Sequence, residues 1–435
     1  MLKKTDRTFP PWLSWMHKGS VAILDQGLIS GSNFLISILL ARWMAPEQYG
    51  AFSLAFAIAL LFIPAFQALI YEPMTVFGPS VYQDCQREYL HALLRIYAGL
   101  AFAIFLALGL AAWVSQAFGR SVALPGALTG VALATPVLLL YGLARAAFYF
   151  QLRPQGALKG AVLYSALVLS GLWVISRRGL LSPFTAFILM AGAAGAGDVL
   201  LLLRLNWSLK SNAAAPSASE ICRRHWEYGR WALASSVVNW LPWNIYYLAV
   251  GGVVGLVFTG TLRALLNLSM PFSQTITAIS LLVLPYAARQ HSSRTRAGIE
   301  GLTRTIVKLY AVGAVAYWGL IILFRHRVLH FLYVNRYTEL GDLIPWLALA
   351  SLIWIMANGL TISLRAMQTP ASVFVAYCVA SAVTLAAGIP AALWFGIRGA
   401  VWGMIVASLA ALIVGWMMVR RQENAQVQVL VVEEA

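Results

Sequence analysis

The fold class is decided by two consecutive apolar segments, SVAILDQGLISGSNFLISILLARWM (residues 20–44) and QYGAFSLAFAIALLFIPAFQALIY (residues 48–71). Each exceeds the roughly 20 residues that an α-helix needs to cross the hydrocarbon core of a bilayer. The pattern continues along the chain of 435 residues, which is 60% hydrophobic and only 11% charged, whereas about 25% of residues are charged in a soluble domain. Such a chain cannot cover itself with a water-facing surface, and the sequence predicts a polytopic membrane protein.

Apolar runs broken by Gly, Pro or charged residues predict about twelve membrane-spanning helices. An all-α fold follows, because hydrocarbon offers no hydrogen-bonding partner to a loop or an open sheet edge. The expected spans are 20–44, 48–71, 90–116, 122–149, 156–175, 183–205, 229–251, 256–285, 305–324, 342–366, 371–394 and 398–419.

The longest expected loop is polar and basic, and it falls near the midpoint of the chain. Six spans lie on each side of it, so both halves enter the membrane from the same face. Weak sequence similarity between the two halves predicts two six-helix bundles related by a pseudo-two-fold axis along the membrane normal, with a cavity between them. The expected parts are a cytoplasmic N-terminus (1–19), an N-terminal bundle (20–205), a cytoplasmic linker (206–228), a C-terminal bundle (229–419) and a cytoplasmic tail (420–435).

The net charge of +16, from 31 Lys and Arg against 15 Asp and Glu, would suggest nucleic acid as a partner in a soluble protein. In a membrane protein it reflects basic loops and an anionic ligand, and we expect no nucleic-acid partner. Most of the Lys and Arg between spans fall on the side that holds both termini. Positive loops stay in the cytoplasm, so both termini are expected there.

Two arginines, Arg145 and Arg263, lie well inside apolar runs. A charged side chain at the bilayer centre is unfavourable by roughly 3 kcal/mol on insertion scales, so such residues face a cavity or a partner. A guanidinium binds phosphate oxygens through paired hydrogen bonds, which suits an anionic lipid headgroup. The alternative is a structural ion pair, for example with Asp25 or Asp198, or a side chain that reaches an interface. The sequence leaves both open.

Polar side chains at helical spacing extend this pattern. Arg263, Asn267 and Gln274 fall on one stripe of the eighth span, because separations of four and eleven residues bring them within about 40° on a helix. Lining of a cavity explains such stripes, and hydrogen bonds between helices explain them equally well. The candidate substrate-binding residues are Arg263, Arg145, Asn267, Gln274, Asn33, Asn239, Trp243, Asn358 and Arg365.

An exporter driven by protons or cations needs a carboxylate at its cavity. The candidates are Asp25, Glu72 and Asp198, each toward the end of an expected span, where an interfacial cap is the alternative. The sequence holds no Gly-x-x-x-x-Gly-Lys-Ser/Thr loop, so nucleotide hydrolysis by that route is excluded. We expect no metal site, no cofactor and no enzymatic activity.

Three segments resemble one family. The first runs from Asp25-Gln26-Gly27 to Arg42-Trp43-Met44-Ala45-Pro46-Glu47-Gln48-Tyr49-Gly50, the second from Gly255 through Arg263 and Asn267 to Leu284-Pro285, and the third from Pro370 to Gly396-Ile397-Arg398-Gly399-Ala400. Together they resemble the bacterial polysaccharide flippases, the Wzx-type oligosaccharide transporters of the multidrug/oligosaccharidyl-lipid/polysaccharide exporter (MOP) superfamily.

The resemblance implies that the chain flips a polyprenyl-pyrophosphate-linked oligosaccharide from the cytoplasmic to the outer leaflet of the bacterial cytoplasmic (inner) membrane. It also implies two bundles that rock about a central cavity, with a polysaccharide polymerase and glycosyltransferases as partners. Three alternatives remain: a multidrug exporter of the same superfamily, a membrane glycosyltransferase or polysaccharide polymerase, and a general lipid scramblase. A drug exporter should carry acids in its cavity, and a polymerase needs catalytic carboxylates at a membrane face.

Overall fold

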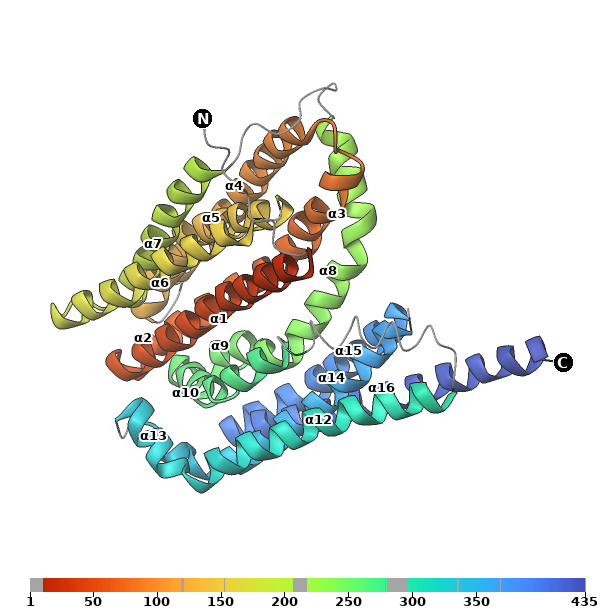
Figure 1. Cartoon of the computed structure of the whole chain (residues 1–435). Coiled ribbons are helices and arrows are strands. Elements are labelled where there is room, and N and C mark those ends of the chain that lie inside the picture. Colours follow the sequence, from red (N-terminus) through yellow and green to blue (C-terminus); the bar gives the residue numbers. More distant parts are fainter. Residues whose placement is uncertain are drawn as a thin grey trace. The chain divides into compact units, whose positions relative to one another are not determined.

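The computed structural model describes residues 11–118, 121–151, 153–205, 217–277, 279, 296–334, 336–367 and 369–434. These residues form helices and short connections, with no strand among them (Figure 1). The helices before the predicted linker are α1 (Pro11–Trp43), α2 (Pro46–Phe66), η1 (Gln67–Tyr71), α3 (Glu72–Ser80), α4 (Gln86–Phe118), α5 (Ala123–Phe150), α6 (Pro154–Arg177) and α7 (Pro183–Arg204). Those after it are α8 (Ala218–Ala249), α9 (Gly251–Val254), α10 (Leu256–Asn267), α12 (Arg296–Leu323), α13 (Arg325–Tyr333), η2 (Thr338–Asp342), α14 (Ile344–Ala366), α15 (Pro370–Val383), η3 (Thr384–Gly388) and α16 (Ile389–Glu434).

Within the described ranges, nine helical stretches are long and apolar enough to cross a membrane. They coincide with the predicted spans, except that the last stretch, Ala371–Gln422, contains the final two. Gly396, at φ 61° and ψ −138°, separates these two spans; glycine tolerates this left-handed backbone because it has no Cβ. The predicted seventh span lies in α8, and the eighth begins as α10. The predicted Leu284-Pro285 end of the eighth span lies outside the described residues.

Two predicted loops are helical instead. Residues 72–80, expected to follow the second span as a loop, form α3, and α8 begins at Ala218, inside the predicted linker. α3 directly follows η1, and the first turns of α8 are rich in charged residues, so that a hydropathy pattern does not distinguish either segment from a connection. The rest of the linker, 206–216, lies outside the described residues.

Two segments of the described chain have π-helical geometry, and each lies close to a proline. Pro64 precedes η1, and Pro390 follows η3. Proline has no N–H to donate, and a local widening of the helix lets the freed backbone groups find other partners inside the membrane.

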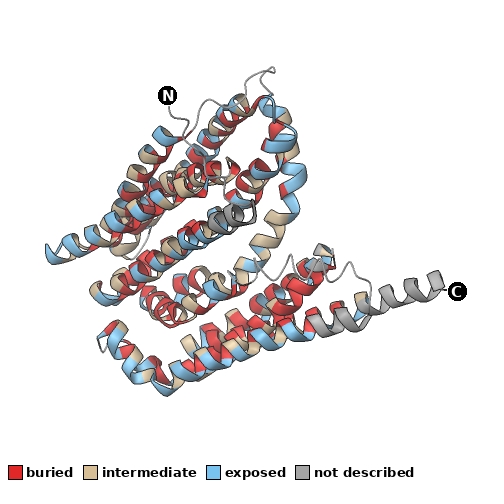
Figure 2. Ribbon diagram, viewed as in Figure 1, coloured by how far each residue is buried: buried red, intermediate tan, exposed pale blue. Residues whose placement is uncertain are grey.

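The described helices expose many large apolar side chains, and Figure 2 shows exposed and buried positions along the same helices. The largest buried side chains are aromatic, among them Tyr49, Tyr89 and Tyr246, while Trp394 is 80% exposed and Trp113 is 62% exposed. An exterior of exposed Trp, Phe, Leu and Val is unfavourable in water and suits a protein whose solvent is lipid.

Contacts divide the chain into two compact units, which differ from the predicted sequential halves. Unit 1 comprises Met1–Ile36, Phe66–Arg120 and Leu128–Arg230, and unit 2 comprises Ser37–Ala65, Ser121–Ala127 and Trp231–Ala435. Most of α2 therefore packs with helices from the second half of the chain. The predicted bundle boundaries follow chain order rather than contacts, and they remain a prediction.

Unit 2 contains a close backbone approach between the start of α2 and the start of α10. A Cβ built on Gly50 would lie 1.8 Å from the carbonyl oxygen of Leu256, and one on Gly260 would lie 2.8 Å from the oxygen of Pro46. These neighbours are main-chain atoms, which cannot move aside as a flexible side chain can. Glycine at both positions is therefore required for this seam between α2 and α10.

Replacing Gly50 with alanine should open the seam and destabilise unit 2. Overpacking typically lowers the free energy of unfolding by about 1–3 kcal/mol, and a backbone neighbour places this site toward the upper end. Thermal unfolding in detergent micelles would measure the loss. The matched control is Gly252→Ala, since a Cβ on Gly252 has no neighbour within 4 Å. Equal stability of the two variants would contradict the assigned role of Gly50.

In unit 1, His225 joins the beginning of α8 to two other elements. Its Nδ1 lies 2.8 Å from the carbonyl oxygen of Leu69 in η1, and its Nε2 lies 2.7 Å from the hydroxyl of Tyr89 in α4. The Leu69 oxygen can only accept, so Nδ1 donates and Nε2 accepts from Tyr89, which fits a neutral ring. Burial lowers the pKa of His225 below its usual value and outweighs the hydrogen bond to Leu69.

The stability of the chain should therefore decrease on acidification. The pKa of His225 is lower in the folded than in the unfolded state, so its contribution is fully present above the unfolded pKa of about 6.5 and is lost as pH falls through the folded value. Between about pH 7.5 and 5, the unfolding temperature of the native chain should fall more steeply with decreasing pH than that of His225→Gln. His326→Gln, at an exposed histidine, should keep the native slope. A slope unchanged by His225→Gln would refute this assignment.

Candidate functional site

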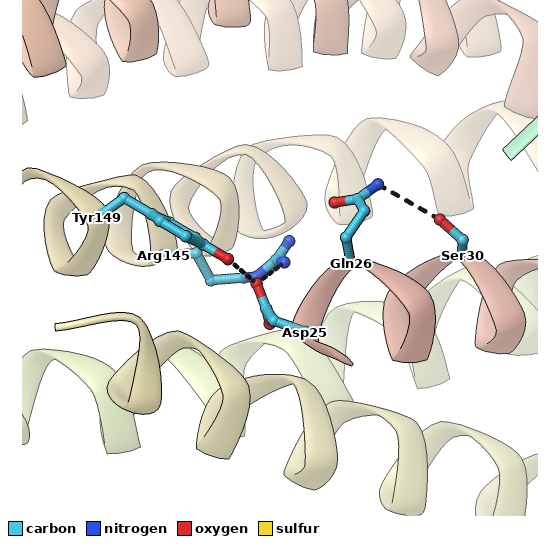
Figure 3. A network of polar contacts seen from close by, with 5 residues as sticks. All are labelled: Asp25, Gln26, Ser30, Arg145 and Tyr149. Carbon is cyan, nitrogen blue, oxygen red and sulfur yellow. Dashed lines mark hydrogen bonds and ion pairs between the residues drawn. The ribbon is translucent and has the colours of Figure 1, made fainter. Parts of the chain in front are cut away.

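Arg145 of α5 forms an ion pair with Asp25 of α1 inside unit 1 (Figure 3). Its Nη2 donates to Asp25 Oδ2 over 2.5 Å, and the hydroxyl of Tyr149 donates to the same oxygen over 2.6 Å. The Asp25 side chain is fully buried, the Arg145 side chain is 16% exposed, and the guanidinium also lies 5.7 Å from the ring centroid of Tyr141. Of the alternatives that the sequence leaves open, the structure shows the pair with Asp25.

Asp198 of α7 is a second buried acid of unit 1, and it belongs to none of the ion pairs of the described residues. Only 4% of the residue is exposed, and neither carboxylate oxygen has a hydrogen-bond partner among the described residues. Its electrostatic neighbours are the phenols of Tyr71, Tyr97 and Tyr141. A buried carboxylate without partners is strongly disfavoured in its charged form, so this side chain is suited to bind a proton or a small cation.

Arg263 of α10 is the buried cation of unit 2, with 8% of the residue exposed. Its guanidinium lies 5.4 Å from the ring centroid of Phe56 in α2, and a side-chain hydrogen bond joins it to Tyr247 in α8. Its Nε has no hydrogen-bond partner, and none of the ion pairs of the described residues includes Arg263. An aromatic face and a hydroxyl stabilise the cation but leave its charge uncompensated.

Asn267, one turn after Arg263, is fully buried in a polar cluster. It accepts from the hydroxyl of Ser37 over 2.9 Å and donates to Tyr49 over 2.9 Å and to Tyr333 over 3.5 Å. Tyr333 in turn donates to the carbonyl oxygen of Ala264 over 2.8 Å. This hydrogen bonding ties α1, α2 and α13 to α10, so the side chain is already engaged within unit 2.

Two further candidates meet in an aromatic cluster of unit 2. Trp243 of α8 contacts Trp354 of α14 edge-to-face with ring centroids 5.6 Å apart, and Trp354 stacks on Tyr377 of α15 at 5.9 Å. Asn358 accepts from the Tyr377 hydroxyl over 3.4 Å and donates to the carbonyl of Trp354 over 3.1 Å. The cluster offers ring faces of the kind that stack on sugars.

The remaining candidates join none of these clusters. Asn33 in α1 is half-buried, Glu72 at the start of α3 is half-buried, and Asn239, Gln274 and Arg365 are exposed. Sequence reasoning did not identify Phe56, Tyr247 and Tyr333, which complete the surroundings of Arg263 and Asn267. An aromatic residue within an apolar run carries no periodic signal, and its partner helix is not known until the helices are packed.

No family model and no curated protein sequence matches the chain. Several solved structures, however, are similar to the chain. An inward-facing multidrug resistance MATE family transporter of the MOP superfamily is similar with a TM-score of 0.76 at 14% identity, covering 93% of this chain and 96% of that one. An outward-facing structure of such a transporter gives 0.65 at 12% identity, over 97% and 98%.

A MOP superfamily transporter from Pyrococcus furiosus also gives a TM-score of 0.65 at 12% identity, over 95% of this chain and 96% of that one. It is described as having a binding pocket of reverse polarity that suggests a different function. At these identities the likeness concerns the fold. The chain has the MATE-like transporter fold, and the predicted all-α architecture of twelve helices in two bundles is confirmed.

Asp25→Asn should destabilise unit 1, because it leaves the Arg145 cation without its counterion while preserving the shape of the side chain. Breaking a buried pair from one side lowers the free energy of unfolding by about 3–5 kcal/mol, and the partial exposure of Arg145 favours the lower end. Thermal unfolding in micelles would measure this loss. The double variant Asp25→Asn/Arg145→Met should recover much of it; strictly additive losses would show that the two charges are not coupled.

Proposed function

We propose that this chain is a transporter that flips an anionic polyprenyl-pyrophosphate-linked oligosaccharide from the cytoplasmic to the outer leaflet of the bacterial inner membrane. Transport by alternating access is supported by the fold, which similar transporters adopt in both inward- and outward-facing structures. A role for a polysaccharide polymerase and glycosyltransferases as partners rests on this proposal, since they would consume and supply the cargo.

The cargo assignment rests on one observation, the buried charge of Arg263, which no acid among the described residues neutralises in an ion pair. Keeping a cation in a low-dielectric site without an acid is unfavourable, and proteins retain such a residue where a ligand supplies the missing charge. A pyrophosphate does so with oxygens that match the planar donors of a guanidinium. Arg145 is less suited to this role, because Asp25 already neutralises it.

The neighbouring features of unit 2 suit the rest of such a cargo. We propose that the rings of Trp243, Trp354 and Tyr377, with Asn358 beside them, contact sugar faces and hydroxyls. In unit 1, we propose that Asp198 is the coupling residue, because its carboxylate is buried and lacks a hydrogen-bond partner.

A multidrug exporter is the second candidate. The similar MATE structures are described as multidrug resistance transporters, and the unpartnered carboxylate of Asp198 suits an organic cation as well as a coupling proton. The two proposals place the cargo charge on opposite residues: Arg263 for an anion, Asp198 for a cation.

Arg263→Ala should abolish export of the lipid-linked oligosaccharide, because the variant loses the only charge in unit 2 that we assign to the pyrophosphate. In a strain lacking this gene, completed repeat units should accumulate on the cytoplasmic leaflet, and the native chain should clear them. Extraction of polyprenyl-pyrophosphate-linked sugars, with leaflet assignment and mass analysis, gives the readout. Arg263→Lys should restore part of the flux, since it keeps charge but loses the planar fork.

The matched control is Arg327→Ala, at an exposed arginine of the same unit, which should transport normally. Equal membrane abundance of all variants separates transport from folding. If lipid-linked sugars and surface polymer remain normal without the gene, and no redundant flippase is active, the flippase proposal is wrong. Drug accumulation assays with Asp198→Asn then test the exporter proposal.

A further inference from the structure

Unit 2 contains a cavity of about 420 Å³ among α12, α14 and α16, and neither Arg263 nor the aromatic cluster lines it. Its walls are mainly apolar, with Val307 from α12, Met356 and Leu360 from α14, and Leu412 from α16. At its mouth, Ile413 and Met417 are more than half exposed. The site is thus a lipid-accessible apolar groove rather than a sealed void.

Three cations lie along one end of this groove. Arg304 and Lys308 are one turn apart and therefore share a face of α12. Arg420 approaches from α16, and its guanidinium lies 4.7 Å from the ring centroid of Trp416, which fixes its direction. The hydroxyl of Thr303, a buried residue, lines the same end.

None of the groove's lining residues that the structure describes is acidic, and neither Arg304 nor Lys308 belongs to an ion pair of the described residues. An occupant must therefore combine anionic oxygens at one end with an apolar body. A free phosphate leaves the apolar walls unused, and a second copy of this chain in an isologous contact would bring the same cations together.

We propose that this groove, the α12–α14–α16 groove, binds an anionic phospholipid, with the phosphate at Arg304, Lys308 and Arg420 and an acyl chain along the apolar walls. Basic pockets between helices at a membrane face bind such headgroups. The charge arrangement predicted from the sequence places these residues at the cytoplasmic face, so the lipid comes from that leaflet. Its bound chain fills space between three helices and stabilises their packing. The proposal does not depend on the identity of the transported cargo.

The experiment uses the full chain, purified and placed in nanodiscs or micelles with dioleoyl-phosphatidylglycerol or, at equal amounts, dioleoyl-phosphatidylcholine. Native mass spectrometry measures retained lipid, and thermal unfolding measures stabilisation. The native chain should retain phosphatidylglycerol selectively and unfold at a higher temperature with it. The triple variant Arg304→Gln/Lys308→Gln/Arg420→Gln should bind this lipid on the order of a hundredfold more weakly, since it removes three headgroup contacts.

A matched triple variant removes the same number of charges elsewhere in unit 2. Arg42→Gln/Arg327→Gln/Arg398→Gln changes exposed arginines outside the groove and should retain phosphatidylglycerol as the native chain does. A further variant, Ile413→Trp, narrows the mouth and leaves every charge in place. It should also weaken retention, which an interaction with the headgroup alone would not predict. Normal unfolding in phosphatidylcholine shows that each variant is folded.

Three results would overturn the proposal. In the first, the groove triple variant would retain as much phosphatidylglycerol as the native chain. In the second, phosphatidylcholine would bind to the chain and stabilise it as well as phosphatidylglycerol does. In the third, polyprenyl pyrophosphate would displace phosphatidylglycerol at equimolar concentration, while excess phosphatidylglycerol would fail to displace polyprenyl pyrophosphate. The last result would make the groove a binding site for the polyprenyl carrier, and the Arg263→Ala transport assay would remain an independent test of the proposed function.

Discussion

The absence of hydrogen-bonding partners in hydrocarbon is the constraint on which this structure depends. Every backbone N–H and C=O within the membrane must be satisfied inside its own helix or by a neighbour. The described chain is accordingly helical, and several of its departures from α geometry lie at or near glycine or proline. The π segments η1 and η3 lie beside Pro64 and Pro390, and the turn at Gly396 uses a backbone conformation that glycine tolerates. The same constraint governs the charges, since each buried charge requires a partner, a proton or a ligand.

That requirement is met differently in the two units. In unit 1 the Arg145 cation is neutralised by Asp25, and Tyr149 adds a hydrogen bond to the same oxygen. Among the residues that the structure describes, Asp198 in the same unit has no such partner, and Arg263 in unit 2 contacts an aromatic face and a hydroxyl but no acid. The ion pair of Arg145 with Asp25 illustrates how a charged residue inside the membrane can have a purely structural role. The two unsatisfied residues are where a proton, cation or anion from outside the protein would complete the local electrostatics.

Much of the fold could be predicted from the sequence, because span length and hydropathy follow directly from the thickness of the bilayer. The site was less predictable. The polar stripe of Arg263 and Asn267 indicated that these residues matter, but not that Ser37, 230 positions away, donates to Asn267. Likewise, the sequence left open whether Asp25 or Asp198 pairs with Arg145. Such pairings depend on the order and rotation of packed helices, which periodicity along one helix does not define. The helical start of α8 was missed for a related reason, because its first turns are as polar as a loop.

The seam between α2 and α10 is made of main chain against main chain at Gly50 and Gly260. Side chains that become fixed at an interface lose rotamer freedom, by up to about 2 kcal/mol each for the long ones, whereas glycine has none to lose. Such a contact forms with little entropic penalty from side chains. The side chains that join α2 to α10 lie beside it, where Asn267 donates to Tyr49 and the Arg263 guanidinium lies over the ring of Phe56. The strength of the backbone contact comes from dispersion forces over a short range, which decay within a small displacement. The two glycines therefore set how closely the backbones of α2 and α10 approach, while the side chains beside them determine what must be broken before these helices could separate.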